Sequence, residues 1–267
     1  MYKIGEAARL MGVSTEALRY YERKGLVTPR KDHESKYRYF DSSQINHLLN
    51  MQRYQKFGFS LYEIVDIFHN CDADQFASFM KVKEQELMRE SLMMNMRIYS
   101  IHQSMEHMKL AKKAKAGILF GERPAMYRLS YMKNDEIIAS SKLDQEMRRW
   151  SSCSDLQFVS AFMKEEDVEK QVDFHEFGIG MYQDIAEFMD VSENEVITYY
   201  EACPALVCCF ESTDTNSILD CIGKVNVFLK EHDLRLAGDL LTQVLYSRCE
   251  ENHFQMQHLL WIPYSEN

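Results

Sequence analysis

Three cations and a phenol lie close together near the start of this 267-residue chain, at Arg19, Tyr20, Arg23 and Lys24. Guanidinium groups bind DNA phosphates or a guanine edge, and a phenol ring fits against a thymine methyl group. This set therefore favours contact with duplex DNA. The alternative, which these residues alone leave open, is the solvated polar face of a small structural helix.

Two short helices are expected to position these side chains. Residues 4–11 read IGEAARLM, with apolar residues at helical spacing, and Gly12 ends that helix. Ser14 then caps a second helix over residues 15–24, which Gly25 closes. Two short helices joined by a tight turn are typical of a helix-turn-helix, whose second helix enters the major groove of DNA.

Residues 25–40 predict a β-hairpin wing that follows the two helices. A turn that contains proline and a polar loop lead to a β-prone YRYF run, in which Arg38 lies on one face and Tyr37 and Tyr39 lie on the other. The wing adds a second element that can approach the duplex.

Residues 42–57 and 61–70 predict two more helices, each preceded by a capping side chain. They form a second helix-turn-helix of similar length. Arg53 and Lys56, on the first of these helices, are expected to bind phosphates at the flank of the duplex.

The ordered set IGEAA, GVS, ALRYYERKGLV, YRYF and GFSLYEI resembles the DNA-binding domain of the MerR family of regulators, over residues 2 to 70. Each fragment alone is a weak signal, whereas the ordered set is specific. The resemblance implies DNA contacts by Thr15, Arg19, Tyr20, Lys24, Tyr37, Arg38 and Tyr39. It also implies a mechanism: a dimer binds a promoter whose spacer is too long, then kinks and untwists it so that RNA polymerase holoenzyme engages both promoter elements.

The charge distribution agrees with a DNA-binding head. Residues 1–58 contain eleven Lys and Arg against six Asp and Glu, a net charge of +5, and the whole chain carries −10, so the remaining residues carry −15. Cations are needed only where the duplex lies, because they neutralise its phosphates. An acidic body behind a basic head is therefore the expected arrangement.

Residues 74–115 contain no Gly or Pro and predict one long helix. Apolar residues recur along it every seven positions, with two more in its second half: Met80, Leu87, Met94, Ile101 and Met108, then Ile98 and Met105. A seam of this length predicts a coiled coil with a second copy of the chain, and hence a homodimer. The resemblance implies that the coil is antiparallel. Methionine at heptad spacing fits core packing better than a thioether metal site.

The seven cysteines include no CxxC pair and indicate reduced thiols in a cytosolic protein, without a disulfide framework or a zinc site. Cys71 stands alone where metal-sensing members of the resembled family carry cysteines, so neither metal nor cofactor is expected. The chain has no apolar run typical of a signal peptide or a membrane span. We therefore expect a cytoplasmic protein with no membrane partner.

Residues 117–267 are long enough for a separate domain, and their pattern reads strand, helix, strand, strand, twice over. The expected elements are strands over 125–132, 156–163, 174–182, 205–211, 240–248 and 254–262, and helices over 140–152, 185–189 and 217–232. The order resembles the GyrI-like effector-binding domain of multidrug-responsive members of the same family, with LLWIPY as its best local match. That resemblance implies a ligand pocket in the groove between the two repeats.

A hydrophobic ligand needs an aromatic pocket, and a lipophilic cation gains further from π faces and a carboxylate. The predicted ligand-binding residues are Tyr127, Trp150, Phe162, Tyr182, Glu201, Tyr246 and Trp261. Most aromatic residues of this half are expected to be core. The last two strands carry no acid, so the counter-charge for a cation falls to Glu176, Glu187 or Glu201, or the aromatic rings suffice.

Together these patterns predict a multidomain α+β protein: a winged helix-turn-helix over residues 1–73, a coiled-coil dimerisation helix over 74–116 and an effector-binding domain over 117–267. The predicted function is a ligand-responsive transcription activator of multidrug-sensing type. The alternatives are a constitutive architectural DNA-binding protein or a repressor without sensing, and a small-molecule hydrolase. The hydrolase would use His175 with Glu176, or Cys208 and Cys209 with His232, but no phosphate loop or nucleophile elbow supports an enzyme.

Overall fold

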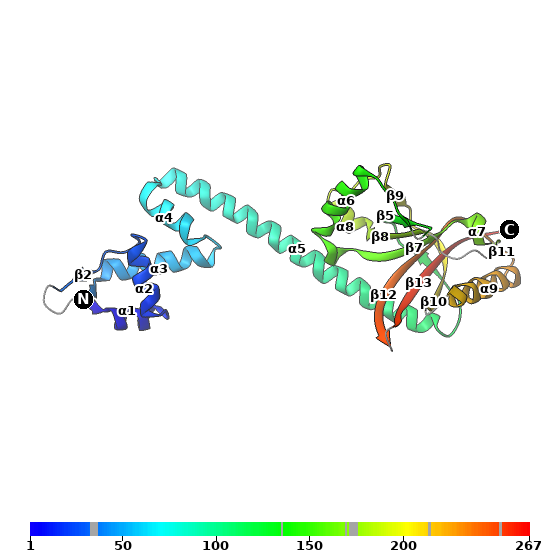
Figure 1. Ribbon diagram of the computed structural model, residues 1–267, viewed down its shortest axis with the longest axis horizontal. Coiled ribbons are helices and arrows are strands. Elements are labelled where there is room, and N and C mark those ends of the chain that lie inside the picture. Colours follow the sequence, from blue (N-terminus) through cyan, green and yellow to red (C-terminus); the bar gives the residue numbers. More distant parts are fainter. Residues whose placement is uncertain (33–36, 135, 169, 171–175, 213–214, 251–252) are drawn as a thin grey trace. The chain divides into compact units, whose positions relative to one another are not determined.

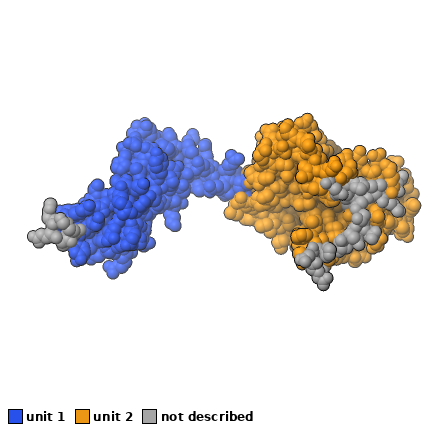
Figure 2. All heavy atoms as spheres, in the orientation of Figure 1, with its two compact units in different colours: residues 1–93 blue, residues 94–267 orange. Residues whose placement is uncertain are grey.

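The computed structural model describes residues 1–32, 37–134, 136–168, 170, 176–212, 215–250 and 253–267. Its elements form an α+β protein with an N-terminal helix-turn-helix, a long helix and a C-terminal domain rich in β-sheet (Figure 1). The fold class predicted from the sequence is confirmed. The chain forms two compact units, residues 1–93 and residues 94–267, which have different colours in Figure 2.

The helices of the first unit begin and end where the sequence predicts, within one residue. They are α1 Ile4–Met11, α2 Thr15–Arg23, α3 Ser42–Lys56 and α4 Leu61–Asn70. The hydroxyl of Ser14 accepts a hydrogen bond from the amide of Ala17, and Asp41 and Ser60 each form a reciprocal capping box with the residue three positions on. Gly12 ends α1 at φ +65°, a conformation that favours glycine.

A small antiparallel sheet completes the wing. Its strands are β1 Tyr2–Lys3, β2 Arg30–Lys31 and β3 Arg38–Phe40, in the order β1-β3-β2. The predicted hairpin corresponds to β2 and β3, and the part of its loop over residues 33–36 lies outside the described residues. Strand β1 was not predicted, because two residues show no alternation of their own. The side chain of Phe40 is fully buried and joins this sheet to the core of the helices, where Leu18, Leu48 and Ile64 are also fully buried.

Helix α5 runs over Ala73–Ala114, 42 residues, as the absence of Gly and Pro predicts. Met80 packs against the core of the first unit. In the second half of α5, by contrast, Met94, Ile98, Ile101, Met105 and Met108 have exposed fractions of 47 to 62%. The boundary between the two units falls inside α5, and the three-part division predicted from the sequence stays a prediction.

Among the described residues, the second unit contains one ten-stranded antiparallel sheet. Its strands are β4 Leu119–Arg123, β5 Met126–Lys133, β6 Glu136–Ile137, β7 Phe158–Met163, β8 Glu176–Tyr182, β9 Ile197–Tyr200, β10 Cys203–Ser212, β11 Leu234–Leu236, β12 Leu240–Glu250 and β13 His253–Glu266. The main path has the order β4-β10-β13-β12-β7-β8-β5-β6, while β11 pairs with β13 and β9 pairs with β5. Strands β4, β6, β9 and β11 were not predicted, and residues 174 and 175 of one predicted strand lie outside the described part.

The predicted double repeat corresponds to β5-α6-β7-β8 and β10-α9-β12-β13. Besides the C-terminal half of α5, the helices described in this unit are α6 Ser141–Ser151, the 3-10 turn η1 Ser154–Leu156, α7 Glu165–Val168, α8 Gln183–Phe188 and α9 Thr215–Glu231. The repeats meet where β7 pairs with β12, with Phe162 opposite Leu241. Consequently both repeats share one sheet (Figure 1).

The two faces of this sheet have different cover. On the outer face, Ile222 and Val225 of α9 pack with Leu206 of β10 and Leu260 of β13. The inner face packs against the C-terminal end of α5, where Ala111 joins a cluster with strand residues. In the part of the chain that the structure describes, no helix has the length and apolar character of a membrane span.

Candidate functional site

The exposed face of α2 carries the predicted DNA-contact residues Arg19, Tyr20, Arg23 and Lys24. The opposite face is anchored because Leu18 and Tyr21 are buried. The ring of Tyr20 has the guanidinium carbon of Arg23 at 5.7 Å and the ammonium of Lys24 at 5.6 Å from its centroid. Among the described residues, none of the three cations has a carboxylate partner, so their charge is available to an external anion.

Thr15 lies at the first position of α2, and its hydroxyl donates to the carboxylate of Glu16 at 3.3 Å. On α3, Arg53 and Lys56 are exposed, and the guanidinium carbon of Arg53 lies 5.3 Å from the centroid of the Phe57 ring. These three residues belong to the same unit as α2. Their contacts with DNA stay predictions.

The wing is tied to α2 through Glu22. Nε of Arg38 donates to Oε2 of Glu22 at 2.6 Å, and the ammonium of Lys31 lies 3.0 Å from Oε1. Burial raises the pKa of Glu22, but the hydrogen bonds from Arg38 and Lys31 outweigh it, and the pKa falls below its ordinary value. Arg38 was predicted to contact DNA; in this structure its guanidinium holds the wing strand against the helix that carries Arg19.

The two wing tyrosines differ in exposure. Tyr37 is 57% exposed, and the ammonium of Lys3 lies 5.9 Å from its ring centroid. Tyr39 is half-buried in the central strand of the small sheet, opposite Lys3 and Arg30. Tyr37 is therefore the better placed of the two for an external contact.

On the inner face of the large sheet, three of the predicted ligand-binding residues belong to one cluster: Phe162, Tyr182 and Trp261. The end of α5 joins them through His107. The Tyr182 hydroxyl donates to Oε1 of Gln243 at 2.6 Å, and Nδ1 of His107 lies 2.8 Å from the same oxygen. The His107 ring meets Trp261 edge-on, with centroids 5.6 Å apart. Burial lowers the pKa of His107 and raises that of Tyr182 well above its ordinary value, so both groups are neutral near pH 7.

The other four predicted ligand-binding residues lie elsewhere in the second unit. Trp150 is buried on α6, and the ring of Tyr127 lies 4.8 Å from that of Tyr199 between centroids. Tyr246 is 38% exposed, directly after a bulge in β12. Glu201 is exposed, and its backbone carbonyl accepts a hydrogen bond from Arg123. The structure thus gathers only part of the predicted set.

Two buried arginines on the sheet were not predicted. Arg128 is 1% exposed; its Nη1 donates to Oε1 of Glu176 at 2.6 Å, and its guanidinium carbon lies 5.2 Å from the Phe162 ring centroid. Arg123 is 7% exposed and, among the described residues, donates only to backbone carbonyls, while its guanidinium carbon lies 5.4 Å from the Tyr200 ring centroid. In the described part of the chain, Nε of both arginines has no partner.

Two neighbouring residues suit these buried arginines: Gly178 leaves room for Arg128, and Tyr200 stays neutral beside Arg123. A Cβ at Gly178 would lie 2.5 Å from the Leu129 carbonyl oxygen and 3.0 Å from the Arg128 guanidinium, so only glycine leaves room there. Burial raises the pKa of Tyr200 to about 12, which keeps this phenol neutral beside Arg123. A signal was present in the sequence: Gly178 and Gly180 alternate on one strand, which indicates close approach by other side chains.

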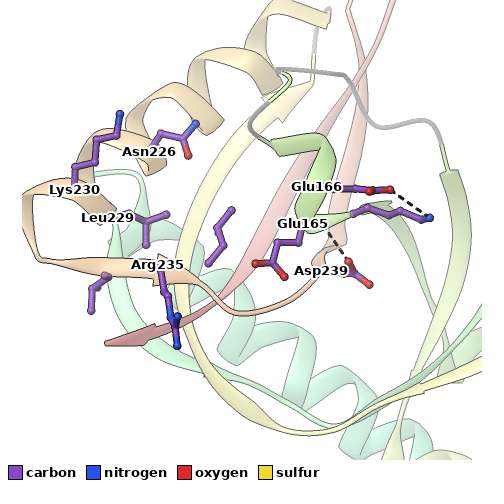
Figure 3. Close-up of a pocket in the computed structure, with 10 residues that line it drawn as sticks. Glu165, Glu166, Asn226, Leu229, Lys230, Arg235 and Asp239 are labelled. Atoms are coloured by element: carbon purple, nitrogen blue, oxygen red, sulfur yellow. Dashed lines mark hydrogen bonds and ion pairs between the residues drawn. The ribbon is translucent and has the colours of Figure 1, made fainter. Parts of the chain in front are cut away.

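A pocket of about 830 Å³ lies at another place, between α9 and the segment that includes α7. Figure 3 shows Asn226 and Lys230 of α9 on one side and Glu165 and Asp239 on the other. The amide of Glu165 donates to Asp239 Oδ1 at 3.1 Å. The lining mixes both charges, and it includes none of the seven described residues predicted for ligand binding.

The residues of the alternative hydrolase have other contacts. His175 lies outside the described residues. The His232 ring stacks on Phe228 with centroids 3.9 Å apart, and the Cys208 thiol faces that of Cys221. Across the described residues, no three His, Cys, Asp or Glu side chains lie close enough to hold a metal ion.

Residues 2–71 match the family model described as MerR HTH family regulatory protein. This part of the chain is therefore a helix-turn-helix domain of the MerR family, as the sequence motifs predict. The mercuric resistance operon regulatory protein of Bacillus cereus is 36% identical over 74 residues, which are 28% of this chain and 56% of that protein. The heavy metal-dependent transcription regulator 2 of Rhizobium meliloti is 38% identical over 64 residues, 24% of this chain and 44% of that protein. The chain thus spans about half the length of the curated relatives it matches, and these relatives are named as regulators.

Two solved structures cover more of the chain at lower likeness. The EcmrR–DNA complex, solved by cryo-electron microscopy, covers 100% of both chains at 14% identity and a TM-score of 0.39. The N-terminal part of MtaN, the Bacillus subtilis multidrug transporter activator, covers 39% of this chain and 98% of that chain at 23% identity and a TM-score of 0.35. TM-scores below 0.5 do not define the fold.

Proposed function

We propose that this protein is a dimeric transcription regulator that binds promoter DNA through α2 and the wing and responds to a small hydrophobic molecule bound in the second unit. The observation that carries the proposal is the exposed face of α2. Arg19, Arg23 and Lys24 lie there without carboxylate partners among the described residues, on a domain that matches the MerR family. A row of such cations on a helix of this kind suits a phosphate backbone.

Each exposed side chain of α2 has a separate role in binding DNA. Arg19 and Arg23 reach phosphates or a guanine edge, Lys24 neutralises a phosphate, and Tyr20 packs its ring against the sugar or a thymine methyl group. Glu22 does not repel the duplex strongly, because Arg38 and Lys31 compensate its charge. The same ion pairs hold the wing at a fixed distance from α2, so that both elements approach the duplex together.

The exposed side of α5 supports the proposed dimer. Met94, Ile98, Ile101, Met105 and Met108 follow one another at alternating intervals of four and three residues, and all are exposed in the single chain. Such a stripe is the seam of a coiled coil, and a second copy of α5 would cover it. Two heads on one duplex supply the contacts that offset the cost of bending promoter DNA for RNA polymerase holoenzyme. The protein would act in the cytoplasm, where that DNA lies.

The ligand groove is proposed on the inner face of the sheet, beside Phe162, Tyr182 and Trp261. His107 of α5 is hydrogen-bonded there, so a ligand that separates it from Gln243 changes how the end of α5 is held. A ligand acts on the promoter only through such a difference in affinity between two states. Arg128 is paired with Glu176, whereas buried Arg123 has no carboxylate partner among the described residues, and this unpaired cation favours a neutral or anionic hydrophobic ligand over a lipophilic cation.

Selection of duplexes from a random pool with the full chain, followed by anisotropy titration of the selected duplex, tests the DNA-binding part. We expect two related half-sites, because a twofold dimer reads two copies of one sequence. Arg19→Ala or Arg23→Ala should weaken binding at least about tenfold, since a good base or phosphate contact contributes about 1–3 kcal/mol. Arg235→Ala, an exposed arginine in the second unit, is the matched control and should leave affinity within about twofold. Equal effects of Arg19→Ala and Arg235→Ala would refute the assigned surface.

Thermal shifts with three naphthalene derivatives, a carboxylate, an alcohol and a quaternary ammonium, test the sensing part. The carboxylate and the alcohol should stabilise the chain, and His107→Ala should alter that shift while selected DNA is still bound. Stabilisation by the ammonium alone would restore the cation-sensing alternative. If all three compounds leave the melting temperature unchanged, the protein is a constitutive architectural DNA-binding protein or a repressor without this sensor.

A further inference from the structure

Two thiols meet inside the second unit, on the outer face of the sheet. Cys208 belongs to β10 and Cys221 to α9, and their sulfur atoms lie 3.3 Å apart. Both are buried, with exposed fractions of 5% and 8%. A disulfide has an S–S distance of about 2.05 Å, so a shift of about 1.2 Å between helix and strand would join them.

A pocket gives this pair contact with solvent. It has a volume of about 560 Å³, and Cys208, Cys221 and Lys224 contribute to its lining. The connection from α5 to β4, residues 114–118, lines the same pocket. A small oxidant that enters this pocket comes next to both cysteines.

The two thiols differ in acidity. The hydrogen bond from Cys208 lowers the pKa of Cys221; burial opposes this, and the ammonium of Lys224 adds to the lowering. The same hydrogen bond and burial raise the pKa of Cys208 well above its ordinary value. Cys221 is therefore the more acidic sulfur of the pair, and the thiolate is the form that reacts with oxidants.

We propose that Cys208 and Cys221 form a redox-reactive pair that hydrogen peroxide converts to an intrachain disulfide. The Cys221 thiolate attacks one peroxide oxygen, and the O–O bond breaks. The departing hydroxide becomes water by taking up the proton that Cys221 had released. The Cys208 sulfur then attacks the sulfenic acid on Cys221, the S–S bond forms, and the S–O bond breaks. The departing hydroxide leaves as a second water with the Cys208 proton, so the two thiols lose the two electrons that the peroxide gains.

The location gives the disulfide a structural consequence. It would join α9 to β10 beside the connection between α5 and β4, where the Lys115 ammonium pairs with Glu211 at 2.8 Å. The other cysteines have different surroundings: the Cys153 thiol donates to the Trp150 carbonyl, and Cys249 is exposed. The proposal does not depend on DNA binding or on the inner-face groove.

Peroxide titration of the full reduced chain, with thiol counting and peptide mass mapping under non-reducing conditions, tests the pair. We expect the loss of two thiols together and a linked peptide pair that contains Cys208 and Cys221 and lacks two hydrogen atoms. Dithiothreitol should separate the two peptides. Because Cys209 shares a peptide with Cys208, the mapping is repeated with Cys209→Ser, which should retain the link.

Cys208→Ser and Cys221→Ser should each abolish the link, and Cys153→Ser is the matched variant of a buried cysteine that should keep it. The wild-type mapping is decisive even if a serine variant fails to fold. Oxidation confined to exposed Cys249, with Cys208 and Cys221 still reduced, would overturn the proposal. A link between Cys209 and another cysteine would overturn it as well.

Discussion

The two units of this protein use arginine in opposite ways. In the first unit, Arg19 and Arg23 are exposed on α2 and have no carboxylate partner among the described residues. In the second unit, Arg123 and Arg128 are 7% and 1% exposed and are bound by carbonyls, a carboxylate and aromatic rings. An exposed, unpaired guanidinium contributes little to folding and is free to bind an external anion. A buried one is costly to desolvate and must be satisfied inside the fold.

This contrast separates the roles of the two units. Arg19 and Arg23 are exposed to solvent, whereas Arg123 and Arg128 are bound by groups of the second unit itself. Substitution of the two kinds of arginine should therefore affect different measurements, binding in one case and stability in the other.

The largest expected effect on stability belongs to Arg128→Met. It leaves the carboxylate of Glu176, whose side chain is 20% exposed, without its cation, and should lower the free energy of unfolding of the second unit by about 3–5 kcal/mol. Adding Glu176→Gln should recover part of that loss. Arg19→Ala should change the free energy of unfolding by less than about 0.5 kcal/mol. Urea unfolding followed by circular dichroism makes the comparison, and equal stabilities of the two single variants would contradict it.

Acid should lower the free energy of unfolding of the second unit, because it protonates histidines that burial keeps neutral. Burial lowers the pKa of His258 to about 4 and lowers that of His107 in the same direction. Below the unfolded value of about 6.5 the unfolded chain takes up protons first, so stability is present above pH 6.5 and is lost as the pH falls towards 4. His258 alone should account for a loss of about 2 kcal/mol by pH 5, and of about 3 kcal/mol once the pH is below 4. Urea unfolding at pH 7.5 and pH 5 measures the loss, and His258→Gln should flatten it; a variant with the same pH dependence as wild type would rule out this source.

Two glycines test the tight packing beside Arg128. Gly178→Ala brings a Cβ within 2.5 Å of a backbone oxygen and should cost about 1–3 kcal/mol. At Gly223, on α9, a Cβ would meet no atom of the described residues within 4 Å, so Gly223→Ala should be neutral or stabilise by up to about 1 kcal/mol. Thermal unfolding distinguishes the two. Two variants with the same melting temperature would show that the sheet tolerates the extra methyl group.

The smallest expected effect on stability concerns a helix cap in the first unit. Asp41→Ala removes the capping side chain that accepts a hydrogen bond from the Gln44 amide at 2.8 Å, and should cost about 1 kcal/mol. Ser43→Ala, at a neighbouring exposed position of the same first turn, is the control and should have almost no effect. If both variants unfold at the same urea concentration, the capping box does not stabilise α3.

The sequence predicted the helices of the first unit closely, because the residues that begin and end them are local signals. Ser14, Asp41 and Ser60 each cap the helix that follows them, and Gly12 takes the backbone conformation that ends α1. Such signals act within four residues and can be read along the chain. The same holds for α5, which continues for as long as no Gly or Pro interrupts it.

For the second unit, the sequence predicted the order of most strands and helices along the chain but not how they are arranged in the sheet. Alternation of apolar residues located most strands, whereas the contact of His107 with Gln243 joins residues that are 136 positions apart. Strand β4 contains Gly121, which is a weak strand former but is needed because a Cβ there would lie 2.9 Å from Val207. Arginine is rarely buried, so neither Arg123 nor Arg128 was expected inside. The ligand-binding set, which depends on such distant contacts, stays a prediction.

The salt dependence of DNA binding by the full chain tests the central claim most directly. The logarithm of the affinity for the selected duplex should fall linearly with the logarithm of the salt concentration. Arg19→Ala should reduce the slope of this line by about 1 for each DNA-binding domain. Two chains should bind each duplex. No binding to duplex DNA at low ionic strength, or a slope that Arg19→Ala leaves unchanged, would contradict the claim that the exposed cations of α2 grip the phosphates.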